Sequence, residues 1–155
     1  MNKILIKQIS VLSLILGAVL GAITIIPYVG ILSFLAQMFV AGTIVLLYMK
    51  KNDFVGKLTP RDGGIYGSII GFVSFIGFSL TFVPIATVIG LFVKGSYYTG
   101  ISMLFRIGFI VLIMMVIFVA ILSALMNAFS GLATVYFSDQ LINEEDQIET
   151  FHIDS

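Results

Sequence analysis

Long stretches without any charged residue alternate with short charged segments along the chain. The uncharged runs cover residues 8–49, 63–93 and 107–138, and every Lys, Arg, Asp and Glu lies outside them. Each run is longer than the roughly 20 apolar residues that cross a hydrocarbon core of about 30 Å. The pattern therefore predicts an all-α, polytopic membrane protein.

The first uncharged run is too long for one helix and contains a turn signal. Pro27 lacks a backbone amide donor, and Gly30 tolerates backbone angles that other residues avoid. We therefore expect two spans in this run, at about 9–26 and about 31–49. The turn between them is so short that the two helices should form an antiparallel hairpin.

A third span is expected at about 63–92, because its start carries three helix signals. Thr59 can cap the helix, Pro60 suits the first helical position, and Asp62 faces the positive end of the helix dipole. A helix across this whole run would be about 46 Å long at 1.5 Å per residue. Either Pro84 kinks the helix, or its last turns extend beyond the bilayer.

The fourth span is expected at about 107–136, after an interfacial segment at 97–106 that mixes aromatic, small and charged residues. Dividing the run 63–93 into two spans would require about 40 apolar residues, so four spans fit better. The predicted architecture is a four-helix transmembrane bundle of two antiparallel hairpins over residues 1–137. An acidic cytoplasmic tail follows at 138–155, helical at most in its first residues.

Composition agrees with the membrane class and excludes others. Of the 155 residues, 59% are hydrophobic and 10% are charged, whereas soluble domains are about 45–50% apolar and about 25% charged. Eight basic residues balance eight acidic ones, so the chain has no excess positive charge with which to bind nucleic acid. The uncharged runs make the lipid bilayer the expected partner. The chain contains no cysteine, which excludes disulfide and thiolate chemistry.

The distribution of basic residues predicts the orientation, because positively charged loops stay on the cytoplasmic side. With four spans, six basic residues would be cytoplasmic and two external: Lys3, Lys7, Lys50, Lys51, Lys57 and Arg61 against Lys94 and Arg106. We therefore expect a multi-pass protein of the inner (plasma) membrane with both termini in the cytoplasm. The N-terminal apolar stretch is longer than that of a cleaved signal peptide, so we expect an uncleaved first span, with cleavage near Gly21 and Ala22 as the alternative.

Small residues recur at steps of three and four in every predicted span. They are Ser10, Ser13, Gly17, Gly21 and Thr24; Gly30, Ser33, Gln37 and Ala41; Gly63, Gly67, Gly71 and Ser74; and Ala120, Ser123, Asn127, Ser130 and Thr134. In lipid, helices associate through small residues and a few hydrogen bonds. We therefore predict Gly17, Gly21, Gly63, Gly67, Gly71 and Ser123 to be helix-packing positions. Contacts within one chain and contacts between copies in a homo-oligomer both fit the pattern.

The predicted spans contain no Asp, Glu, Lys, Arg or His. Such groups usually mark intramembrane transport or catalysis, so proton-coupled antiport and intramembrane proteolysis are disfavoured. Gln37 and Asn127 are the most polar side chains at depth. They either line a polar pathway or, as we favour, form hydrogen bonds between helices. We expect Ser123, Ser130 and Thr134 to bond mainly to their own helix.

Motifs for cofactors, metals and covalent catalysis are missing. The sequence contains no phosphate-binding GxxxxGK, no nucleophile-elbow GxSxG and no zinc-ligand spacing. The one histidine, His152, lies in the tail without a second ligand nearby in the sequence. We therefore predict no catalytic residue, no cofactor and no metal site.

In outline the chain resembles a group of bacterial four-span membrane proteins of unknown function. The shared outline is a hairpin, a basic loop, a glycine-rich third span and a charged tail. The residues that carry it are Lys50-Lys51, Arg61, Gly63-Gly64, Gly67 and Gly71. The resemblance covers architecture over most of the chain and implies neither a mechanism nor a site.

Two functions are compatible with these observations. The first is a small integral membrane protein with a non-enzymatic structural or accessory role, which packs with other membrane helices or with itself. The alternative is an oligomeric channel or carrier for a small solute, with a path lined by Gln37, Ser123, Asn127 and Ser130.

Overall fold

The computed structural model describes residues 3–26, 28–52, 54–56, 58–92 and 108–153. The described residues form helices joined by short turns and contain no strand, which confirms the all-α prediction. The helices are α1 (Lys3–Ile23), α2 (Val29–Phe39), α3 (Ala41–Lys51), α4 (Pro60–Phe92) and α6 (Phe109–Ile153). The expected interfacial segment at 97–106 lies outside the described residues.

Three of these helices are long and apolar enough to cross a membrane. The candidate spans are Ile4–Ile23, Pro60–Gly90 and Phe109–Ser138. The pair α2 and α3 becomes a fourth span if the two helices cross the bilayer together. The described residues therefore define a membrane protein with three to four candidate spans.

The second predicted span is not one straight helix, so this part of the prediction is wrong. α2 and α3 have 11 residues each and meet at Val40 with a bend of 66°. No proline or run of polar residues marks this position in the sequence. The cause is a side chain from α6, described below.

α4 begins as the sequence predicts. The Asp62 N–H donates to the Thr59 hydroxyl at 3.3 Å, while the Asp62 carboxylate accepts from the Thr59 N–H at 3.1 Å. These reciprocal bonds form a capping box, which satisfies amides that the first helical turn leaves free. The helix then continues for 33 residues with Pro84 inside it. At 1.5 Å per residue α4 is about 50 Å long, more than the thickness of the hydrocarbon core.

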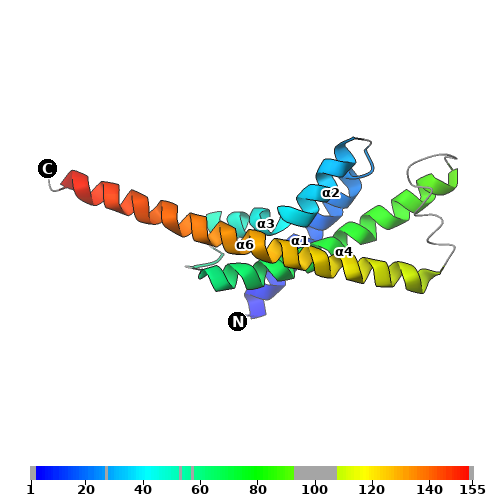
Figure 1. Cartoon of the computed structure of the whole chain (residues 1–155), viewed down its shortest axis with the longest axis horizontal. Helices are drawn as coiled ribbons and strands as arrows, with labels where there is room; N and C mark the ends of the chain where they lie inside the picture. Colours follow the sequence, from blue (N-terminus) through cyan, green and yellow to red (C-terminus); the bar gives the residue numbers. More distant parts are fainter. Residues whose placement is uncertain (1–2, 27, 53, 57, 93–107, 154–155) are drawn as a thin grey trace.

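α6 is the longest element, and Figure 1 shows its C-terminal part projecting well beyond the other helices. It starts just after Gly108, whose φ is +148°, a backbone conformation that glycine adopts most readily. The helix includes residues 138–153 of the acidic tail, where we expected helix only at the beginning. The tail is therefore a helical extension of the last candidate span.

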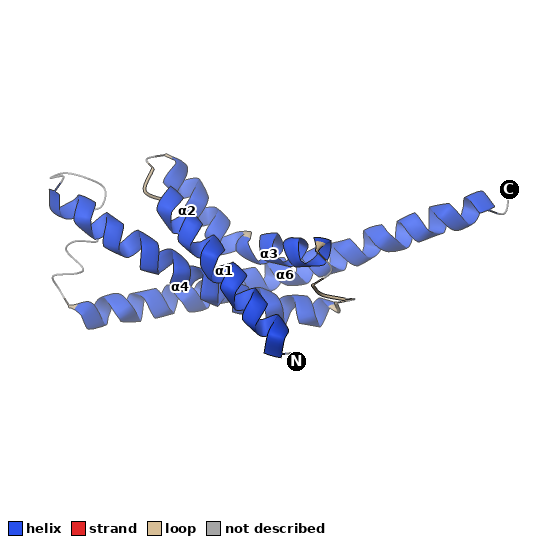
Figure 2. Ribbon diagram, turned by 180° about the vertical axis from the view of Figure 1, so that it is seen from behind, coloured by secondary structure: helices blue, strands red, loops and turns tan. Residues whose placement is uncertain are grey.

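α4 lies between α1 and α6, and Figure 2 shows α1 crossing it obliquely. Two apolar clusters fill the contacts. The first contains Ile9, Val45, Leu46, Met49, Val55, Tyr66 and Ile70, and the second contains Phe75, Phe78 and Ala120. Most other large apolar side chains, above all those of α6, face outward, as expected of helices surrounded by lipid.

A polar network at the break between α2 and α3

Asn127 of α6 inserts its side-chain amide into the backbone between α2 and α3. Its Nδ2 donates to the carbonyl oxygens of Met38 at 3.0 Å and Gln37 at 3.2 Å, and its Oδ1 accepts from the Gly42 N–H at 2.6 Å. In a continuous helix the Gly42 N–H would donate to the Met38 carbonyl four residues earlier. The Asn127 amide therefore replaces this helical bond at the point where the chain bends.

This insertion explains the bend. A side chain that enters the helical ladder is one of the few established causes of a kink. The break exposes carbonyls at the end of α2 and amides at the start of α3, and each would cost about 1–3 kcal/mol if buried without a partner. Val40 at the N-cap makes no side-chain capping bond. The asparagine side chain can bond to both kinds of released group, because its NH₂ donates to carbonyls and its oxygen accepts from backbone amides.

Gln37 lies three residues before Val40, where α2 and α3 meet, and its side chain connects this break to α4. Its Nε2 donates to the Ser74 hydroxyl at 2.7 Å, and both side chains are completely buried. Its Oε1 has no partner, the one such side-chain atom buried within the described part of the chain. A buried acceptor in this state carries a desolvation cost, so Gln37 is the least satisfied polar group of the network.

Ser123 joins the same network from α6. Its hydroxyl donates across to the Gly71 carbonyl of α4 at 3.0 Å, and Asn127 Nδ2 donates to the Ser123 carbonyl at 2.9 Å. The expectation that Ser123 bonds mainly to its own helix is wrong. Thr134 does bond to its own helix, through the Ser130 carbonyl at 2.7 Å.

Three glycines of α4, Gly63, Gly67 and Gly71, lie against the backbone of α6 beside this network. A Cβ atom added at Gly63 would be 2.6 Å from the Gly131 carbonyl oxygen, and one at Gly71 would be 2.5 Å from the Ser123 oxygen. At Gly67 it would overlap the Asn127 carbonyl. Only a residue without a side chain permits helices to approach so closely, and this approach brings Asn127 to the break.

A second glycine contact joins α1 to α4. A Cβ atom at Gly17 would overlap the Ser74 backbone, and one at Gly21 would be 2.6 Å from the Phe78 oxygen. Gly77 of α4 faces Leu14 in the same way. Gly77 and Gly131 were not singled out in the sequence, although each continues a small-residue spacing: Gly77 follows Ser74 by three residues, and Gly131 follows Asn127 by four.

Hydroxyl groups extend the polar contact between α3 and α6 towards the end of α3. Thr43 Oγ1 lies 2.5 Å from Ser130 Oγ and 2.9 Å from Thr134 Oγ1, and Lys50 Nζ donates to the Ser138 hydroxyl. A groove of about 550 Å³ runs along this side. Neither Gln37 nor Asn127 lines this groove.

The network consists of groups suited to hydrogen bonding. Its side chains are amides and hydroxyls, which are neutral, and they bond mostly to backbone groups of neighbouring helices. Across the residues whose placement is described, no group of three or more His, Cys, Asp or Glu is arranged to hold a metal ion. The network thus bonds helix to helix through neutral groups.

Comparison of the chain with protein-family models, with curated proteins and with solved structures finds no significant match. The class of the protein therefore follows from its own fold. It is an all-helical membrane protein whose described residues supply three to four candidate spans.

Proposed function

We propose that the protein is a small integral membrane protein with a non-enzymatic, structural or accessory role. Its four spans form a four-helix bundle of two hairpins, and its outer faces pack with other membrane helices or with further copies of the chain. It resides in the inner (plasma) membrane with both termini in the cytoplasm.

The observation that carries the proposal is the insertion of Asn127 between α2 and α3. The most polar side chain of the last span bonds to Gly42, Met38 and Gln37 at the backbone, so its donors and acceptor already serve the fold. A substrate would have to displace these bonds. Uncharged spans support the same conclusion, because transport and catalysis within membranes usually need an ionisable group.

The apolar surface of α6 supports the packing role. Only 17% of the most apolar stretch of Phe109–Ser138 is buried, whereas the corresponding value for α4 is 44%. Phe118, Leu125 and Phe129 are each more than half exposed on α6. A face of this length can contact either lipid or another apolar helix.

The experiment is a parallel measurement of assembly and flux. Gln37→Leu and Asn127→Leu are each purified in detergent for determination of oligomeric state and reconstituted for solute flux across liposomes. The accessory role predicts altered stability or assembly and no flux in either the parent or the variants. Flux in the parent that is lost in variants with intact assembly would disprove it.

A channel or carrier is the second candidate, and one observation favours it. The unpartnered Gln37 Oε1 lies beside a broken helix, and broken helices form substrate and ion sites in many transporters. A carrier would transiently hydrate this oxygen and open the contact between Gln37 and Ser74. Flux that falls in Gln37→Leu but persists in Thr87→Val, an α4 change outside the network, would support it.

A further inference from the structure

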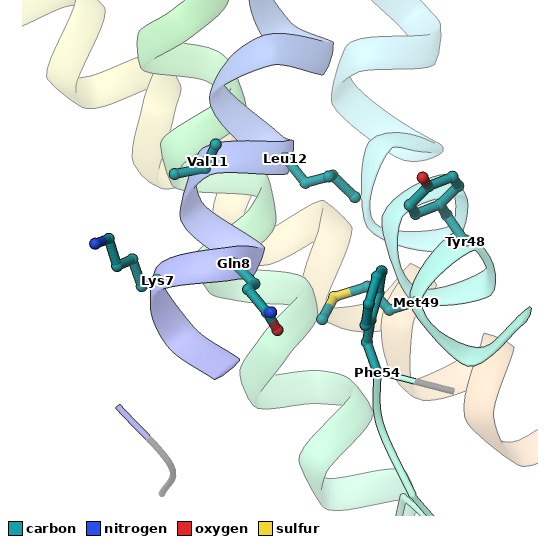
Figure 3. Close-up of a pocket in the computed structure, with 7 residues that line it drawn as sticks. All are labelled: Lys7, Gln8, Val11, Leu12, Tyr48, Met49 and Phe54. Carbon is teal, nitrogen blue, oxygen red and sulfur yellow. The ribbon is translucent and has the colours of Figure 1, made fainter. Parts of the chain in front are cut away.

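A groove between the start of α1 and the end of α3 has a lining unlike the polar network. Its volume is about 340 Å³. The lining residues are Lys7, Gln8, Val11 and Leu12 of α1, Tyr48 and Met49 of α3, and Phe54 of the following turn. Figure 3 shows Leu12, Tyr48, Met49 and Phe54 around a common space, with Gln8 at one end of it.

On the α1 side of the groove the lining changes from polar to apolar residues. Lys7 and Gln8 line one end, and Val11 and Leu12 follow one turn later, so the change from polar to apolar takes about 6 Å at 1.5 Å per residue. Met49, which is 1% exposed, lines the groove from α3. Phospholipids have the same order of groups, a polar head followed by a hydrocarbon chain.

The positive charge of Lys7 also fits an anionic phospholipid. Lys7 is the one charged side chain among the described residues that line the groove. In Figure 3 the Lys7 side chain projects from α1 away from the two aromatic rings. A lysine near a helix end extends its stem along apolar surface and places its ammonium group at the headgroup level. The polar end of the groove therefore suits an anion.

We propose that this groove binds one acyl chain of an anionic phospholipid. The chain lies between Leu12, Met49 and Phe54, and the phosphate lies near the Lys7 ammonium and the Gln8 amide. The volume is at the lower end of the range for ligand sites, about 300–1,000 Å³. The site is independent of the role proposed above, because neither Gln37 nor Asn127 takes part in it.

Native mass spectrometry of the full chain in detergent tests the site with two added lipids, dioleoylphosphatidylglycerol and dioleoylphosphatidylcholine. We expect the anionic lipid to bind about fivefold more tightly, as one basic contact near the surface provides. Lys7→Gln should abolish this preference and Lys7→Arg should keep it. Lys51→Gln is the matched control, and equal loss in this variant would show a diffuse charge effect and overturn the site.

A second pair of variants tests the apolar part. Val11→Phe places a ring in the groove and should weaken both lipids at least threefold. Val19→Phe makes the same change about two helical turns further along α1, at nearly the same exposure, 50% against 49%, and outside the groove. Equal effects of the two changes would overturn the proposal, as would competition by inorganic phosphate alone or a Lys7-dependent shift from monomer to dimer without bound lipid.

Discussion

The backbone amide of Gly42 donates a hydrogen bond to Asn127 Oδ1 at 2.6 Å, although the two residues are 85 positions apart. The same Asn127 side-chain amide donates to the Met38 carbonyl. These two bonds replace the backbone hydrogen bond that Gly42 and Met38 would form in a continuous helix. In lipid nearly every backbone group released at the break needs such a partner, because no water is present to form the hydrogen bond instead. The bend between α2 and α3 and the contact between α4 and α6 therefore depend on each other.

Replacement of Asn127 by Leu should destabilise the protein. The change removes the partners of the Gly42 amide and the Met38 carbonyl, and we expect the free energy of unfolding to fall by about 2 kcal/mol. Reversible unfolding in mixed micelles measures this loss. Met126→Leu, at a 41% exposed neighbouring position, is the control and should change stability by less than about 0.5 kcal/mol.

The same variant should straighten the α2–α3 pair, because the released backbone groups can pair with each other. Spin labels at Ile31 and Leu47, both exposed, would then move apart by several ångström towards the roughly 24 Å of a straight helix. The absence of cysteine in the chain permits the labels to be introduced without further changes. An unchanged distance in Asn127→Leu would show that the bend has another cause.

Two glycines of α4 should respond in opposite ways to alanine. At Gly67 the new methyl group overlaps the Asn127 carbonyl, whereas at Gly64 its nearest neighbour is 3.8 Å away. Gly67→Ala should lower the free energy of unfolding by about 1–3 kcal/mol through overpacking. Gly64→Ala should be neutral or stabilising by up to about 1 kcal/mol, because alanine favours helix. Thermal melting in detergent compares them, and equal melting temperatures would contradict the close contact.

The pair Gln37 and Ser74 should behave non-additively. Ser74→Ala leaves the buried Gln37 amide without its one partner and should cost about 1–3 kcal/mol. Gln37→Met removes the unpartnered oxygen together with the bond, so it should cost less. The double variant should then resemble Gln37→Met alone. A double-mutant cycle gives the coupling energy, and strictly additive losses would mean that the two side chains do not interact.

Thr43→Val should weaken the contact between α3 and α6. The hydroxyl lies within hydrogen-bonding distance of Ser130 and Thr134, and bonds of this kind between membrane helices contribute about 0.6–2 kcal/mol. The same change at Thr87, whose hydroxyl donates to Val83 of its own helix, should have little effect. Unfolding free energies that do not differ between the two variants would contradict this role for Thr43.

Cysteine labelling should decide whether α2 and α3 cross the bilayer together. The turn residue Tyr28 is 93% exposed, and Gly56 has open space around it. Four spans predict that Tyr28→Cys reacts from outside intact cells and that Gly56→Cys reacts only after permeabilisation. If both react from outside, the pair returns to the side on which it entered, and the C-terminus of the chain lies outside the cytoplasm.

The distribution of charge and of small residues was sufficient to predict most of the elements. Uncharged runs predicted apolar helices because an ionic side chain is costly in lipid, and Thr59 with Asp62 predicted the start of α4. These signals are local. A capping box joins residues three apart, and a helical face repeats within four residues, so both can be recognised without knowledge of the partner helix.

The bend at Val40 and the pairing of the faces depend on distant contacts. Gly42 is the one weak helix former next to Val40, and a single glycine does not predict a break. The amide that breaks the ladder belongs to the distant Asn127. In the same way, the spacing of Gly63, Gly67 and Gly71 indicated a contact face but not its partner. The partner is a backbone surface of α6, and backbone surfaces are alike in every helix. Sequence thus determined which residues form long apolar helices, because that property is local, and tertiary structure decided which of them meet.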